Sequence, residues 1–197
     1  MKKWFYILPL CLFCILTSCS ETKETGKFDN WKVRNQNYLD SLETVFANQT
    51  PDANGRVLQR FLLITEPDEC IYYKVLDPVT DVDPNDGYEY LPGYKREDVK
   101  PKATDKVSVY YRGSLINGDY FDGFEGKNPT VADAPLTTGV NSNIILGWKE
   151  VLQHMSVGER WEVYLPAIYG YGRIDKPGIP GHSLLIFDMQ LFDILEE

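Results

Sequence analysis

The sequence predicts an α+β fold in which an antiparallel sheet wraps around one short helix. Segments with the two-residue period of β-strands dominate the second half of the chain, and one segment with helical spacing, residues 144–155, interrupts them. The order strands, one helix, strands is typical of an antiparallel sheet with a helix on one face. The 197 residues, 43% hydrophobic and 25% charged, suffice for one folded domain with an appended segment.

The N-terminus has the pattern of a bacterial lipoprotein leader. Two lysines precede an apolar run over residues 4–16, which is too short for a helix that crosses a bilayer of about 30 Å. The run ends in Leu16-Thr17-Ser18-Cys19, which is similar to a lipobox, so we expect a signal peptide at residues 1–18 and a lipid on Cys19. The alternative is an ordinary secretory leader with a chance cysteine. Ser20 favours a cell-envelope protein that is anchored to the outer membrane. Whether it lies on the periplasmic or the surface face of that membrane stays open.

A tether and a helical extension are expected between the leader and the first clear strand. Residues 19–30 are small, polar and charged, as in a flexible tether. Within the extension, residues 31–68, apolar side chains recur at helical intervals from Trp31 to Phe46 and predict an amphipathic helix. Residues 57–64 are apolar and short, so periodicity does not distinguish helix from strand there.

The first strands are predicted from their side-chain pattern. Residues 70–76 are β-branched and aromatic, and residues 106–115 alternate between apolar and polar side chains. Asn117-Gly118 then predicts a tight hairpin turn, because both residue types tolerate a positive φ. The returning strand should therefore carry Phe121 and Asp122.

The remaining elements complete the predicted sheet and its helix. The helix at residues 144–155 should have its N-terminal cap at residues 142–143. Strand alternation returns over residues 159–165 and 183–195, whereas residues 77–100 are rich in Asp, Pro, Gly and Tyr and predict an irregular loop.

Composition excludes several classes of function. Once the leader is removed and Cys19 carries lipid, only Cys70 remains, and its apolar neighbours predict a small buried hydrophobe without a disulfide. No cysteine or histidine spacing suits zinc, and the acidic residues between 66 and 89 lack the spacing of a calcium-binding loop, so we expect no metal. The net charge of −9 disfavours nucleic acid as a partner.

The motifs between Glu69 and Glu197 resemble, in order and spacing, those of the FKBP-type peptidyl-prolyl cis–trans isomerases. The motifs that carry the resemblance are Val109-Tyr110-Tyr111-Arg112-Gly113-Ser114-Leu115, Gly118, Phe121-Asp122, Ile144-Ile145-Leu146-Gly147-Trp148, Met155-Ser156-Val157-Gly158-Glu159-Arg160, Leu165-Pro166, Tyr169-Gly170-Tyr171-Gly172, Ile179-Pro180-Gly181-His182-Ser183 and Leu185-Ile186-Phe187. The resemblance implies an FKBP-like domain over residues 69–197 that isomerises X–Pro bonds.

The resemblance also implies an apolar site without a nucleophile, metal or cofactor. Trp148 would form the floor under the prolyl ring, and the hydroxyl of Tyr171 and the backbone N–H of Ile145 would donate to substrate. Asp122 would orient polar groups around the twisted amide. The walls would come from Tyr111, Phe121, Ile144, Ile145 and Phe187. A further wall contact and a contact at the mouth would come from Leu136 and Ile179.

The chemistry of X–Pro bonds explains why such a site needs apolar residues. Rotation about the amide crosses a barrier of about 18–20 kcal/mol, because the C–N bond has partial double-bond character. Rotation removes this resonance and its charge separation. A water-poor pocket that binds the twisted amide better than either planar form therefore lowers the barrier without covalent chemistry.

Some positions depart from the family pattern. Gly123-Phe124 stand where the family has small hydroxyl residues, and residues 126–135, at the expected pocket edge, are hard to align. The loop before Gly147 has one residue more than the family, which could shift the roles of Ile144 and Ile145 by one position. These departures concern the shape of the pocket more than the fold.

Three functions stay open at this point. The first is an isomerase acting on proline-containing polypeptides of the envelope, held at the membrane by the lipid on Cys19, with macrolides as a possible ligand class. The second is a non-catalytic module that binds proline or hydrophobic segments, as a chaperone or assembly factor. The third assigns dimerisation or docking to the helix over residues 31–46. We expect His182 in a turn and His154 on the surface, both without an acid–base role.

Overall fold

The computed structural model describes residues 26–64, 66, 68–80 and 91–195. The predicted signal peptide, Cys19 and residues 81–90 lie outside the described residues. In chain order, the elements are α1 (Trp31–Asn48), β1 (Gln59–Leu62), β2 (Cys70–Leu76), β3 (Lys106–Leu115), β4 (Tyr120–Gly123), β5 (Leu136–Gly139), α2 (Leu146–His154), β6 (Arg160–Leu165), the 3-10 helix η1 (Ala167–Tyr169) and β7 (Leu185–Leu195).

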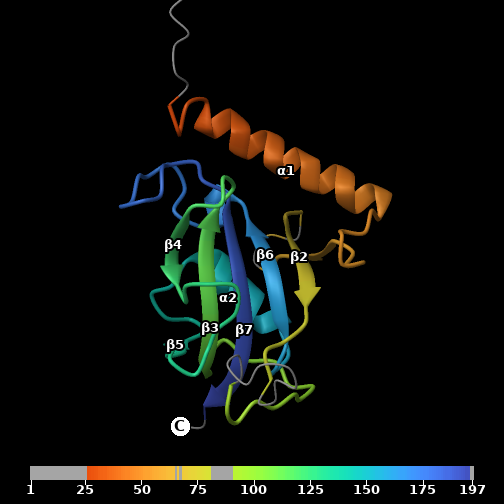
Figure 1. Ribbon diagram of the computed structural model, residues 1–197, viewed down its shortest axis with the longest axis vertical. Coiled ribbons are helices and arrows are strands. Elements are labelled where there is room, and N and C mark those ends of the chain that lie inside the picture. Colours follow the sequence, from red (N-terminus) through yellow and green to blue (C-terminus); the bar gives the residue numbers. More distant parts are fainter. Residues whose placement is uncertain (1–25, 65, 67, 81–90, 196–197) are drawn as a thin grey trace, which may run out of the picture.

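The strands of the described residues form one antiparallel sheet in the order β1-β2-β6-β7-β3-β4, and β5 also pairs with β3. Figure 1 shows α2 behind the long strands β3, β7 and β6, while α1 lies across one end of the molecule. The predicted fold class, an antiparallel sheet around one short helix with an N-terminal helix, is confirmed. Among the described residues, no helix is long and apolar enough to cross a membrane.

One face of the sheet, which we call the inner face, packs against α2. The alternation along β7 sends Leu185, Phe187, Met189 and Leu191 into the main core. The core continues through the buried side chains of α2, which are Trp148, Val151 and Leu152. The inner face therefore places an aromatic-rich core around the short helix.

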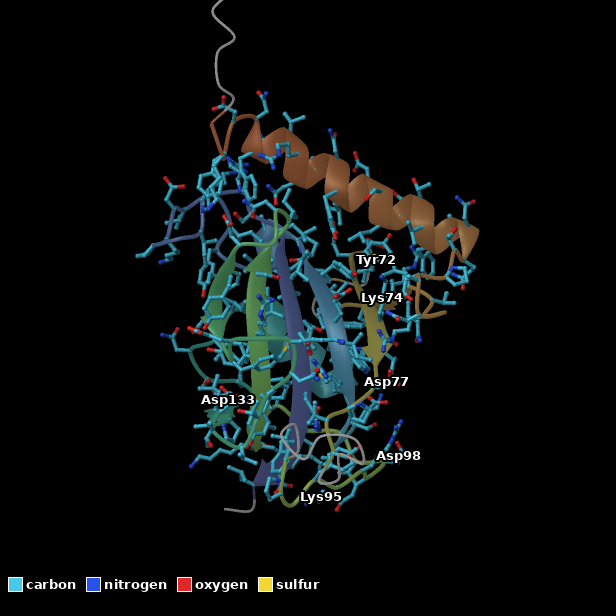
Figure 2. The ribbon with its side chains drawn as sticks, in the orientation of Figure 1. Tyr72, Lys74, Asp77, Lys95, Asp98 and Asp133 are labelled. Carbon is cyan, nitrogen blue, oxygen red and sulfur yellow. The ribbon has the colours of Figure 1, made fainter. Side chains whose placement is uncertain are left out.

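The opposite, outer face is covered by two separate segments. At one end, Leu42 of α1 packs in a cluster with Tyr72 of β2 and Tyr164 of β6. At the other end, the segment after β2 joins a cluster that contains Val79, Leu91, Tyr110 and Phe124. Figure 2 shows this separation, with Tyr72 beneath α1 and Lys95 at the far end of the sheet.

Gln190 fixes the second covering segment to β7. Its side-chain amide accepts a hydrogen bond from the Val79 N–H at 2.8 Å and donates to the Val79 carbonyl at 2.7 Å. Gln190 is buried, so these bonds satisfy both halves of the amide away from water. The predicted irregular loop is thus attached to the sheet through its first residues.

The structure corrects two predictions about the N-terminal part, and it adds a strand at the pocket edge that was not predicted. Residues 59–62 of the predicted helical extension form the edge strand β1, with Phe61 opposite Ile71. Residues 26–30 of the predicted tether form a hydrogen-bonded turn, in which the Asp29 N–H donates to the Gly26 carbonyl. The sequence also gave no signal for β5, whose four residues are too few to show a period.

Candidate functional site

Four aromatic rings from four different elements meet on the inner face and form what we call the aromatic bowl. They are Tyr111 of β3, Phe121 of β4, Trp148 of α2 and Phe187 of β7. Ring centroids lie 4.8 Å apart for Tyr111 and Trp148, 5.4 Å for Trp148 and Phe187, and 5.7 Å for Phe121 and Phe187, each pair edge to face. This is a favourable geometry for aromatic pairs.

Gly113 allows two of these rings to meet. It lies on β3 between β4 and β7, opposite Asp122 on one side and Phe187 on the other. A Cβ at this position would lie 2.5 Å from the Phe121 ring and 3.1 Å from the Phe187 ring, too close for either to stay in place. The sequence signal for this contact is a glycine inside a strand pattern, which indicates that another group approaches the backbone closely.

The start of α2 positions Ile144, Ile145 and Trp148. Ile145 is the N-cap residue in an extended conformation, so its N–H lies outside the hydrogen-bond ladder of the helix. The predicted cap at residues 142–143 is wrong, because the Ser142 hydroxyl bonds the hydroxyl of Thr138 instead. Both isoleucines are half-buried and pack against the main core, and their role as walls of the pocket stays a prediction.

A carboxylate and two tyrosines supply the polar groups of the bowl. The Tyr111 hydroxyl donates to Asp122 Oδ2 at 2.9 Å, and the Gly123 N–H donates to Asp122 Oδ1 at 2.9 Å. Burial is the main cause, and the hydrogen bond to Asp122 the second, that raises the pKa of Tyr111 well above its ordinary value. Burial, and then the nearby Asp122 charge, also raise the pKa of Tyr171. Both hydroxyls therefore stay protonated at neutral pH and can donate.

The loop between η1 and β7 carries two further predicted residues, Tyr171 and Ile179. Tyr171 packs half-buried against the main core, and Ile179 is buried within it. The Lys176 ammonium lies 5.8 Å from the centre of the Tyr171 ring, a contact that the sequence analysis did not foresee. His182 lies just before the final strand with a φ of 64°, in the turn where we expected it.

Leu136 is a predicted site residue that the structure leaves exposed on β5. It lies on β5 directly opposite Val109 of β3, so both side chains point to the same face of the sheet. Leu136 is nevertheless exposed, whereas Val109 is fully buried. Its role as a pocket wall stays a prediction.

Two expectations about residues outside the bowl are wrong. Cys70 is half-buried rather than fully buried: it packs against the cluster around Tyr72 and also lines a groove of about 720 Å³ between α1 and the segment after β6. The His154 ring is half-buried and stacks on Phe61 at a centroid distance of 3.9 Å, because β1 covers this end of α2. Among the described residues, no group of His, Cys, Asp and Glu side chains is arranged to hold a metal ion.

Comparison with known proteins agrees with this geometry. Residues 97–192, which include every ring of the bowl, match the family model described as FKBP-type peptidyl-prolyl cis-trans isomerase. This chain carries an FKBP-type domain. FkpA of Escherichia coli K12 is 36% identical over 94 residues, which are 48% of this chain and 33% of that protein. Mip of Coxiella burnetii is 35% identical over 109 residues, or 55% and 45% of the two chains.

The match therefore concerns the FKBP-type domain, because the chain covers less than half the length of these curated relatives. The crystal structure of E. coli FkpA aligns with a TM-score of 0.55 and 24% identity over 84% of this chain and 61% of that one. An isomerase structure from Pseudomonas syringae aligns with a TM-score of 0.51 and 22% identity, over 82% of this chain and 96% of that one. At these identities, the structural likeness shows the fold alone.

Proposed function

We propose that this chain is a peptidyl-prolyl cis–trans isomerase, and that its FKBP-type domain binds the twisted X–Pro amide in the aromatic bowl. The aromatic bowl carries the proposal, because its four rings meet edge to face and the hydroxyl of one of them, Tyr111, is bonded to Asp122. The names of the relatives, which are peptidyl-prolyl cis-trans isomerases, support the same activity.

The bowl suits an amide that loses its resonance. A planar X–Pro amide is polarised and well solvated, whereas the twisted amide has less charge separation and favours an apolar surrounding. Trp148 and Phe187 are both buried and apolar, so they offer such a surrounding to the prolyl ring. Stronger binding of the twisted form than of either planar form is sufficient for catalysis.

Two hydrogen-bond donors orient the peptide in this proposal. The Tyr171 hydroxyl would donate to one substrate carbonyl, and the free N–H at the start of α2, from Ile145, would donate to another. Asp122 holds Tyr111 and lies close enough to Tyr171 to act on its pKa, which keeps the polar rim organised. The peptide chain is thereby aligned while the amide turns.

The exchange rate between the cis and trans forms of a short X–Pro peptide, measured by magnetisation transfer, tests the proposal. We expect the purified protein to accelerate this exchange, and the Tyr171→Phe and Asp122→Ala variants to accelerate it less. A folded protein that binds the peptide without any acceleration would contradict the proposal, and would favour a non-catalytic binding module.

The N-terminal sequence supports a location for this activity. We propose that Cys19 carries lipid and anchors the domain to the outer membrane, where it would act on proline-containing polypeptides of the envelope. Uncatalysed X–Pro isomerisation takes tens to hundreds of seconds, long enough to limit the folding of such polypeptides. Metabolic labelling with a palmitate analogue should mark the wild type and a Cys14→Ser control. Labelling that persists in Cys19→Ser would contradict the anchor.

A further inference from the structure

The first two turns of α1 are bonded to the loop that carries Tyr171. The indole Nε1–H of Trp31 donates to the Ser183 hydroxyl at 2.8 Å, and that hydroxyl donates to the Pro180 carbonyl at 2.6 Å. The Leu184 N–H donates to Asn35 Oδ1 at 2.7 Å. These bonds join residues about 150 positions apart in the sequence, between side chains that are buried.

Asn35 is held in one orientation by bonds at both ends of its amide. Its Nδ2 donates to the Trp31 carbonyl one turn earlier at 2.8 Å, so Oδ1 is left to accept from Leu184. Leu184 precedes β7 and lies outside the ladder that begins at Leu185. Its buried N–H therefore takes its acceptor from α1 rather than from the sheet.

Residues 170–184, which we call the site loop, form a cross-linked unit. The His182 N–H donates to the Gly172 carbonyl at 2.7 Å, while Lys176 and Ile179 exchange two backbone hydrogen bonds of 2.8 and 2.9 Å. The residue bonded to Trp31, Ser183, is thus one residue from His182, and His182 is bonded to the neighbour of Tyr171. Ser183 is therefore connected to Tyr171 through two peptide bonds and the hydrogen bond between His182 and Gly172.

We propose that Trp31 and Asn35 are positioning residues of the isomerase site, which hold Tyr171 and Ile179 against the aromatic bowl by fixing the end of the site loop. In this account α1 is part of the functional unit, and not only a connection between the domain and the N-terminus. The inference rests on the proposed isomerase function.

The other end of α1 supplies a matched control. Phe46 lies on the last turns of the helix, with its ring 5.8 Å from that of Tyr72 and 4.5 Å from the Arg60 guanidinium. These contacts attach α1 to the sheet through β1 and β2, without a bond to the site loop. Phe46→Ala therefore weakens the docking of α1 and leaves both loop-fixing bonds in place.

The test compares Asn35→Leu, Trp31→Phe and Phe46→Ala in the otherwise intact protein, below its unfolding transition. We expect Asn35→Leu to lower kcat/KM for an X–Pro peptide by about tenfold and to shift the NMR signal of the Ile179 methyl group, because the loop loses its fixed end. In a Tyr171→Phe background, Asn35→Leu should lower kcat/KM by a clearly smaller factor, because the hydroxyl that it positions is absent. Phe46→Ala should lower the melting temperature and leave both readouts unchanged.

The outcomes separate positioning from general stabilisation. Equal losses of kcat/KM in Asn35→Leu and Phe46→Ala, or an unmoved Ile179 methyl signal in Asn35→Leu, would overturn the inference. If Asn35→Leu does not fold, Trp31→Phe decides, since it removes one hydrogen bond and keeps a ring in place. A wild type without isomerase activity would refute the proposed function, whereas the Ile179 signal would still report whether α1 positions the loop.

Discussion

The two faces of the sheet are built in different ways. The inner face packs against α2, and its Tyr111 and Phe187 rings meet Trp148 of α2 in the aromatic bowl. The outer face is closed by α1 at one end and by the segment after β2 at the other. The inner face thus carries the chemistry of the proposed function, whereas the outer face determines how firmly the sheet and the site loop are held.

The middle of the outer face contains a charged pair instead of an apolar cluster. Arg160 of β6 bonds Asp188 of β7 with two hydrogen bonds of 2.8 and 2.5 Å, and its side chain is only 7% exposed. The same guanidinium donates to the Lys127 carbonyl and to Asn128. These partners satisfy a buried charge, which would otherwise be costly. The outer face therefore combines apolar clusters at its two ends with a hydrogen-bonded charged pair between them, whereas the inner face is stabilised by apolar packing against α2.

The largest effect should follow from removal of the bowl's floor. We expect Trp148→Ala to lower kcat/KM by about 100-fold or more, which corresponds to about 3 kcal/mol of lost transition-state binding. The matched control is Val151→Ala, because Val151 is also buried on α2 but contributes no ring to the bowl. Isomerisation of an X–Pro peptide, measured on folded protein, checks both variants. Normal turnover in folded Trp148→Ala would show that the bowl is not the site.

A large change in stability without a change in catalysis is expected on the outer face. Gln190→Leu leaves the buried N–H and carbonyl of Val79 without their partners, which should destabilise the protein by about 1–3 kcal/mol. We expect kcat/KM of the folded variant to stay within about twofold of the wild type, because the bowl is untouched. Denaturant unfolding and the isomerase assay measure the two effects. A tenfold loss of activity would contradict the division between the faces.

Two adjacent tyrosines on β3 allow the two faces of the sheet to be compared within one strand. Tyr111 faces inward and donates to Asp122, whereas Tyr110 faces outward and meets Phe192 edge to face at 5.4 Å. Tyr111→Phe should lower kcat/KM about two- to tenfold, as expected for one hydrogen bond worth about 0.5–1.5 kcal/mol. Tyr110→Phe should leave kcat/KM unchanged. Equal effects of the two substitutions would mean that the Tyr111–Asp122 bond does not serve the reaction.

A change of pH should have the smallest effect on kcat/KM. Burial raises the pKa of Tyr111 and of Tyr171 above the ordinary tyrosine value, so both hydroxyls stay protonated where an exposed tyrosine would begin to ionise. We therefore expect kcat/KM to be flat from neutral pH to about pH 9.5, just below the ordinary tyrosine pKa. A fall in kcat/KM within this range that disappears in Tyr171→Phe would show that Tyr171 ionises early, contrary to the structure.

The inner face could be predicted from the sequence, and most of the outer face could not. Alternation along residues 183–195 predicts which side chains of β7 enter the core. The resemblance to the isomerase family, carried by the motifs from Val109 to Phe187, implies which rings meet. The contact of Asn35 with Leu184 has no sequence signal, because it joins a buried amide on a helix to a backbone N–H far along the chain. The conformation of short apolar segments cannot be predicted for a different reason. Residues 57–64 have too few side chains to show a period, and only pairing with β2 decides their conformation.

The most direct test of the division between the faces compares the same substitution at two positions of β7. Phe187 meets the Trp148 ring edge to face at 5.4 Å on the inner face, and Phe192 meets Tyr110 in the same way at 5.4 Å on the outer face. We would measure kcat/KM of Phe187→Leu and Phe192→Leu on one X–Pro peptide, below the unfolding transition of both. The account predicts a loss of about tenfold for Phe187→Leu and no more than about twofold for Phe192→Leu. Equal losses, or a larger loss in Phe192→Leu, would contradict it.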